Sequence, residues 1–207
     1  MKRSETPFKS ARDQHPLPFK LDGSFSWLRA LPRHKEHVGV MRRRRLQTQL
    51  KKVEAAAMQH NIILPPEFVA FIADVELQAR IRSITDCYLG MGTNLLPLRD
   101  GYLLRFLNDS QGCAFWYLFL RPSSESHAVV ICYDFFDADD PDSADLAELH
   151  PKKFVFDSPT FETWLCRFWL ENEIIFAHLD NTALPEVGEK FIRLYTNHAY
   201  LDELEDI

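Results

Sequence analysis

The stretch YLLRFLNDSQGCAFWYLFL, residues 102–120, contains two runs of apolar and aromatic residues separated by a polar turn. The runs cover residues 102–107 and 114–120, and both are rich in the aromatic and branched residues that favour strands. The turn, residues 108–112, ends in Gly112 and has the length of the longer hairpin connections. The sequence therefore predicts a β-hairpin here.

Further strands are predicted on both sides of this hairpin. Residues 88–89 and 95–98 precede it with strand-like spacing, and residues 128–136 follow it with apolar side chains almost throughout. Such a run is typical of a central strand that is covered on both faces. A shorter strand is expected at residues 153–156.

Helical spacing of apolar residues predicts helices before and after the strands. A long helix is expected between His37 and His60, with Val38, Met41, Leu46, Leu50, Val53 and Ala57 on its apolar face. A second helix follows Pro65, and a buried helix is expected to start with Ser158 as its cap and Pro159 in its first turn. A final helix is expected at about residues 185–195. Together these elements predict an α+β domain.

The two ends of the chain have a different composition. Residues 1–23 mix proline, charge and few apolar side chains, which predicts a flexible arm. Phe25, Trp27 and Leu28 then form an apolar patch, which predicts a docking turn that ends near Pro32. We therefore divide the chain into an arm and docking turn (1–34), a single domain (35–195) and an acidic tail (196–207).

Three passages resemble the SUKH superfamily, which includes yeast cell-wall-assembly regulators and bacterial immunity proteins. Residues 54–72, with Leu-Pro-Pro-Glu-Phe at 64–68, are similar to the family's opening helix, Leu-Pro step and next helix. Residues 102–120 resemble its central hairpin, and residues 158–165 its closing helix. The resemblance covers about residues 50–175. It implies a mixed, mainly antiparallel sheet packed against helices, no catalytic apparatus, and binding of protein partners such as toxins.

The charges are divided unequally along the chain. Residues 1–52 hold 14 basic and 4 acidic residues, a net charge of +10, whereas the remainder holds 10 basic and 26 acidic residues, a net charge of −16. This division is typical of an acidic surface for a basic partner, or of a basic arm for an anionic one.

The acidic loop, residues 137–145, is the sharpest local feature of the sequence. With Glu148 just beyond it, the loop supplies the predicted partner-binding residues Asp137, Asp139, Asp140, Asp142, Asp145 and Glu148. Four of these match carboxylate positions of a calcium-binding loop, but Pro141 and Asp142 occupy positions where a ligand and a glycine are required. A solvated charge run and a partner-binding loop are the two alternatives that we retain.

A second charged group is basic and lies on the predicted long helix. Its members are Arg42, Arg43, Arg44, Arg45, Lys51 and Lys52. They could bind phosphate groups, but we favour a solvated helix face that pairs with the acidic remainder of the chain.

No enzyme chemistry is indicated by the remaining polar residues. The sequence has no glycine-rich phosphate loop and no nucleophile elbow, and its histidines have no metal-ligand spacing, so we expect no cofactor and no metal. The four cysteines are widely separated, as is typical of reduced thiols. No signal segment or membrane span is evident, so we expect a cytoplasmic protein.

The leading hypothesis is therefore an immunity protein that neutralises a basic toxin domain by direct binding. The alternatives are an intracellular adaptor or regulatory scaffold, and nucleic-acid binding through the basic helix. The apolar helix faces can close within a monomer or across a dimer.

Overall fold

The computed structural model describes residues 8–10, 15–40, 43–138, 140 and 142–196. Its centre is a seven-stranded sheet of order β1-β7-β6-β5-β4-β2, in which β3 also pairs with β4. All pairs are antiparallel except β1 with β7, so the predicted α+β fold with a mainly antiparallel sheet is confirmed. The strands are β1 (Lys9–Ser10), β2 (Tyr88–Leu89), β3 (Leu96–Leu98), β4 (Gly101–Asn108), β5 (Phe115–Leu120), β6 (His127–Cys132) and β7 (Val155–Ser158).

The predicted hairpin is formed by β4 and β5 at the middle of the sheet. Its register runs from Tyr102 opposite Leu120 to Asn108 opposite Phe115, with an irregularity between Arg105 and Leu107. Gly112 closes the turn with a φ of 74°, a conformation that glycine adopts without steric cost. The hairpin prediction is therefore confirmed.

Both faces of the sheet are buried, because alternate side chains of each strand point to opposite sides. In β5, Leu118 and Leu120 belong to one apolar cluster, whereas Tyr117 and Phe119 belong to another. We call the first side the helix face, because the helices pack on it. We call the second the loop face, because the segment after β6 packs on it through Phe135, Phe136, Ala144, Leu149 and Phe154.

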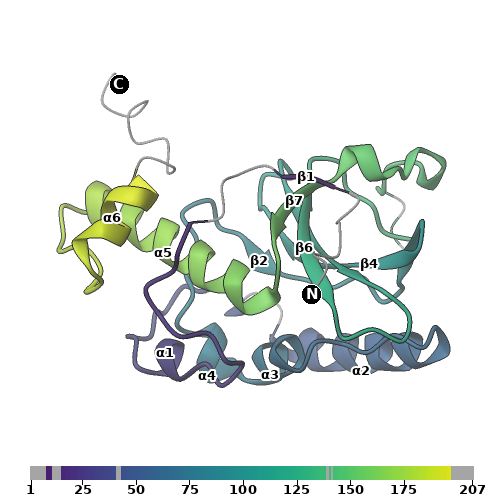
Figure 1. The fold of residues 1–207 in the computed structure, drawn as a ribbon, viewed down its shortest axis with the longest axis horizontal. Helices are drawn as coiled ribbons and strands as arrows, with labels where there is room; N and C mark the ends of the chain where they lie inside the picture. Colours follow the sequence, from purple (N-terminus) through teal and green to yellow (C-terminus); the bar gives the residue numbers. More distant parts are fainter. Residues whose placement is uncertain (1–7, 11–14, 41–42, 139, 141, 197–207) are drawn as a thin grey trace.

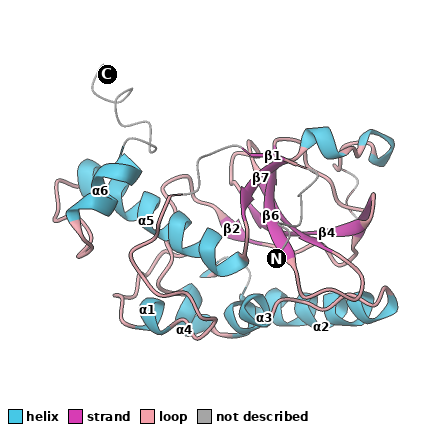
Figure 2. Ribbon diagram, viewed as in Figure 1, coloured by secondary structure: helices cyan, strands magenta, loops and turns pink. Residues whose placement is uncertain are grey.

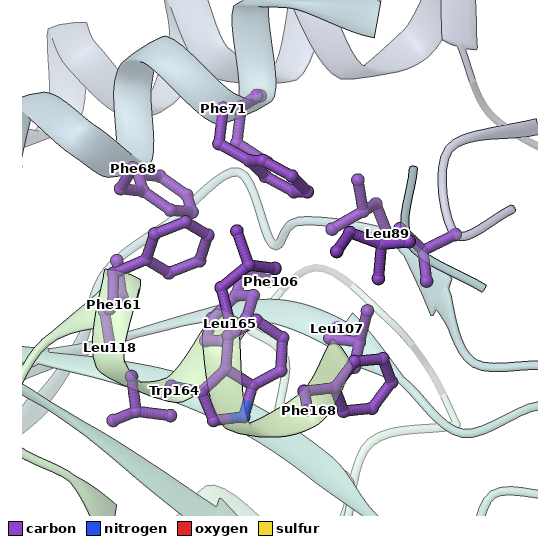
Figure 3. Packing of buried hydrophobic residues seen from close by; sticks show 14 of the residues in the cluster. Phe68, Phe71, Leu89, Phe106, Leu107, Leu118, Phe161, Trp164, Leu165 and Phe168 are labelled. Carbon is purple, nitrogen blue, oxygen red and sulfur yellow. The ribbon is translucent and has the colours of Figure 1, made fainter. Parts of the chain in front are cut away.

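The helix face is covered by helices from both halves of the chain (Figures 1 and 2). These are α2 (Arg43–Gln59), α3 (Pro66–Ala73) and α5 (Phe161–Leu179), with the short helices α1 (Ser26–Arg29) and α4 (Val75–Gln78) beside α3. The last helix, α6 (Glu189–Thr196), packs on α5 away from the strands. Phe161 lies at the centre of this side, with ring centroids 5.2 Å from Phe68 and 5.5 Å from Phe106 (Figure 3). Aromatic contacts therefore join the helices to the sheet.

The N-termini of α3 and α5 meet at the start of β6. The side chain of His127 in β6 is only 7% exposed. Its Nε2 accepts a bond of 2.9 Å from the N–H of Phe161 and lies 3.2 Å from a carboxylate oxygen of Glu67. Cys132, at the other end of β6, belongs to the cluster on the loop face. The two side chains, an odd number of residues apart in one strand, therefore lie on opposite faces of the sheet.

The long helix begins later than its apolar spacing predicts. Val38 precedes α2 and links two other segments, since its N–H donates to Ile81 and its carbonyl accepts from Leu89. Met41 lies outside the described residues. The buried residues Leu46, Leu50, Val53 and Ala57 form the inward face of α2 as predicted.

The cap of α5 is also different from the prediction. Ser158 is buried at the end of β7, where it pairs with Val129 of β6, so it belongs to the sheet and not to the helix. Thr160 is the cap, and its side chain accepts a bond from the N–H of Thr163. Pairing with β6 therefore moves the helix start by two residues.

The described part of the N-terminal arm packs against the domain. Lys9–Ser10 adds a parallel strand beside β7, and the buried Phe8 joins the cluster on the loop face. Further along, Phe19 stacks on Trp27 of the docking turn with a centroid distance of 5.3 Å. Trp27 also donates to Glu162 of α5. Composition predicts a flexible arm because it averages over the segment, whereas the packing depends on a few aromatic side chains at particular positions.

Candidate functional site

The chain leaves the sheet after β6 and crosses the loop face. The strand that was expected to continue to residue 136 ends at Cys132, because residues 133–136 turn back over β5. Phe136 is buried there, and Phe135 packs at its edge with a ring centroid 5.0 Å from that of Phe115. This crossing brings the acidic loop onto the loop face.

The start of the acidic loop is fixed by a buried ion pair. Arg105 of β4 donates to the carboxylate of Asp137, and both side chains are about nine-tenths buried. The same guanidinium donates to the carbonyl of Gly90 at 3.0 Å and to Asn108, and it lies over the ring of Phe135 at 4.6 Å. The loop is thus bound to the central hairpin through a side chain with several partners.

The hydroxyl of Tyr117 provides a second attachment. It accepts a bond from the N–H of Phe136 at 3.0 Å and donates to the carbonyl of the same residue at 3.3 Å. Burial raises the pKa of the Tyr117 hydroxyl well above its ordinary value, so the group stays neutral and keeps both bonds.

The segment after the loop is held by Lys153, which lies in the 3₁₀-helix η3 (Pro151–Lys153). Its ammonium group lies 2.8 Å from the carboxylate of Asp134 and 2.8 Å from that of Glu148. Hydrogen bonds to these two carboxylates raise the pKa of Lys153. The lysine therefore joins the residues before and after the acidic loop.

The carboxylates at the tip of the loop remain available. Asp140 accepts from the N–H of Asp142, and Asp145 accepts from the N–H of Ala147, which are local turn contacts. None of these three aspartates has an ion pair within the part of the chain that the structure describes. Asp139 lies outside that part. Asp140, Asp142 and Asp145 therefore carry negative charge without a counterion among the residues that the structure describes.

Two exposed apolar side chains flank the charged tip. Tyr133, just before the loop, has 66% of its surface exposed, and Leu146, in the 3₁₀-helix η2 (Leu146–Glu148), has 42% exposed. Lys153 joins Asp134, the neighbour of Tyr133, to Glu148, which lies in the same short helix as Leu146. The acidic loop thus has exposed apolar side chains close to both of its ends in the sequence.

Asp137 does not belong with the other predicted partner-binding residues. Its carboxylate is turned inward to Arg105, so it anchors the loop and presents no charge to a partner. The same contact removes it from the calcium-binding pattern that the loop spacing suggests. Among the described residues, no group of three His, Cys, Asp or Glu side chains could hold a metal ion.

The basic helix is placed differently from our favoured interpretation. Arg45, Lys51 and Lys52 are exposed on α2, and none of them pairs with an acidic residue of the described chain. Arg42 and the side chains of Arg43 and Arg44 lie outside the description. The three described residues are solvent-exposed as expected, but the expected pairing with the acidic remainder of the chain is wrong for them. The acidic loop in particular lies over the loop face, whereas α2 covers the helix face.

Sequence reasoning missed the residues that hold the acidic loop, namely Arg105, Tyr117 and Lys153. One signal for Arg105 was present, since a single arginine within an apolar strand requires a buried counterion. The strand itself does not indicate which carboxylate supplies that counterion. No comparable sequence signal marked Tyr117 or Lys153.

Comparison of the chain with protein-family models, with curated proteins and with solved structures found no match. In the described residues, no helix is both long enough and apolar enough to cross a bilayer.

Proposed function

We propose that this chain is a protein-binding domain whose acidic loop docks on a basic surface of a partner protein. The observation that carries this proposal is the combination of a fixed base and an uncompensated tip. Arg105 and Tyr117 hold the start of the loop, while Asp140, Asp142 and Asp145 have no cation of their own among the described residues. A solvated charge run requires no such anchoring.

The physical roles of the two kinds of side chain differ. Exposed carboxylates accelerate the encounter with a basic partner but contribute little affinity, because water and salt screen them. The exposed side chains of Tyr133 and Leu146 supply apolar area that a partner can bury, which is the usual source of affinity at an interface. A fixed loop also loses less conformational entropy on binding than a mobile one.

The resemblance to the SUKH superfamily supports a particular kind of partner. Within that proposal the chain is an immunity protein, and its partner is a basic toxin domain that is blocked by direct contact. A regulatory or adaptor role would use the same surface with other partners. Capture of partners from the native cell distinguishes the two, because an immunity protein binds one toxin at equal stoichiometry.

The test is a comparative pull-down with three forms of the full chain. The loop variant carries Asp140→Asn, Asp142→Asn and Asp145→Asn, which keep the oxygens that accept the local backbone bonds. The control variant removes three negative charges at exposed positions elsewhere, by E36Q, E125Q and E186Q. We expect one stoichiometric protein with the wild type and the control, and its loss with the loop variant.

Equal recovery of that partner by the loop variant would remove the acidic loop from the interface and overturn the proposal. Recovery of several housekeeping proteins, reduced in the loop variant only, would retain the binding surface and replace the immunity role with the adaptor role.

A further inference from the structure

The outward face of α2 is a second charged surface, separate from the acidic loop. The inward face of the helix is fixed by the buried residues Leu46, Leu50, Val53 and Ala57. At 100° per residue, Thr48 lies opposite that apolar stripe, and Arg45, Lys51 and Lys52 lie on either side of it. Glu54 is the one acidic residue within the helix. The exposed side is therefore basic from Arg45 to Lys52, and it carries no further basic residue up to the end of the helix at Gln59.

We propose that the basic face of α2 binds double-stranded nucleic acid through its phosphates, without reading the sequence. Arg45, Lys51 and Lys52 have no ion pair within the described chain, so binding a phosphate does not require an existing ion pair to break. Arg45 and Lys52 are seven residues apart, which is about 10 Å along a helix axis. A duplex carries a negative charge about every 1.7 Å of its axis, so several phosphates fall within this length.

The expected binding free energies favour a nucleic acid over a second copy of the chain as the ligand of this face. The acidic loop of another molecule could offer three carboxylates to these cations, but exposed ion pairs contribute at most about 1 kcal/mol each. Three such pairs are weaker than the roughly 4 kcal/mol of a millimolar complex. A duplex instead releases condensed counterions for each phosphate that is neutralised, and this release drives binding at low salt.

The composition of the helix favours a duplex over a single strand. Proteins that bind single strands without sequence preference stack the bases on aromatic side chains. The sequence of α2, RRRLQTQLKKVEAAAMQ, contains no aromatic residue. Its exposed polar and basic side chains suit contacts to a regular phosphate backbone, which carry no base information.

This inference does not depend on the proposed function. The cations lie on a helix that covers the helix face, and the proposed protein-binding carboxylates lie over the loop face. The loop variant described above is therefore expected to bind a duplex as the wild type does. Failure of one proposal leaves the other intact.

The experiment measures fluorescence anisotropy of a labelled random-sequence 20-base-pair duplex with the full chain over a salt series. The test variant is K51Q/K52Q, at exposed positions where glutamine suits a helix. The control is K152Q/K190Q, which makes the same change in net charge at exposed positions outside α2. Each phosphate contact contributes about one unit to the slope of log affinity against log salt.

We expect the test variant to bind more weakly and to lose about two units of that slope, and the control to bind like the wild type. Equal affinity of the test variant and the wild type would overturn the proposal. Displacement of the duplex by polyglutamate of equal charge would overturn the preference for nucleic acid. Salt-sensitive self-association of the wild type, lost in the test variant, would assign the face to a second copy instead.

Discussion

The two faces of the sheet are buried by different means. On the helix face, aromatic and aliphatic side chains from six helices form the larger core, centred on rings such as Phe161 (Figure 3). On the loop face, a smaller core is covered by the segment after β6, whose position depends on polar contacts such as Arg105 with Asp137. Apolar packing therefore stabilises the helix face, whereas a few hydrogen bonds and ion pairs position the acidic loop on the loop face.

The largest loss of stability is expected from truncating the side chain of Phe161 at the centre of the helix face. Phe161→Ala removes a fully buried ring with contacts to Phe68, Phe71, Phe106 and Trp164. We expect the free energy of unfolding to fall by about 4 kcal/mol, as for other buried phenylalanines. Urea denaturation measures this loss. Leu179→Ala, at an exposed position of the same helix, is the control and should change it little.

Breaking the ion pair on the loop face should lower the free energy of unfolding by a comparable amount, and a second substitution should restore most of it. Arg105→Met leaves the Asp137 carboxylate buried without its partner, which should cost about 3 kcal/mol. The double variant Arg105→Met with Asp137→Leu removes both charges and should regain most of this loss. Urea denaturation of the four combinations gives the coupling energy. Additive losses would show that the pair does not act as a unit.

A smaller effect is expected from the hydroxyl of Tyr117. Tyr117→Phe removes the acceptor of the Phe136 N–H, which should cost about 1.5 kcal/mol and release the start of the acidic loop. Hydrogen exchange of the Phe136 amide should accelerate more than that of amides in β5. Tyr133→Phe, at an exposed tyrosine, is the matched control. Unchanged protection at Phe136 would refute this attachment.

The smallest effect concerns Glu67, at the border of the helix face. Burial opposes its ionisation, but the hydrogen bond with His127, a backbone hydrogen bond and the charge of His127 together outweigh burial and hold the pKa of Glu67 below its ordinary value of 4.5. A lowered pKa in the folded state stabilises the fold above pH 4.5, and this contribution is lost as the pH falls through the folded pKa. Glu67→Gln should therefore flatten the decline in stability below that pH. Urea denaturation at a series of pH values measures this decline. The same dependence of stability on pH in the variant and the wild type would contradict the ion pair of Glu67 with His127.

The comparison between the two faces also explains what could be predicted from the sequence. The hairpin and the apolar stripe of α2 follow from local patterns of apolar residues, so both were predicted. The acidic loop was recognised by its composition alone. Its attachment could not be predicted, because the contact of Arg105 with Asp137 joins residues 32 positions apart through a fold that local patterns do not specify.

The separation of the two charged surfaces was missed for a similar reason. Net charges along the chain indicate that a basic and an acidic part exist, and attraction between them is the simplest expectation. Successive side chains of β5 point to opposite faces of the sheet. Leu118 faces the side that α2 covers, and Tyr117 faces the side that the acidic loop covers, so the two charged parts are kept apart. Only the assembled sheet shows that the two charges lie on opposite sides.

The most direct test of this account is the association rate of the captured protein partner at low and high salt. With the loop variant, the rate should fall several-fold at low salt, and the difference should shrink as salt rises, because screening removes long-range attraction. The control variant E36Q/E125Q/E186Q should associate as the wild type does. Equal association rates for the loop variant and the wild type at low salt would contradict the claim that the acidic loop is a recognition surface.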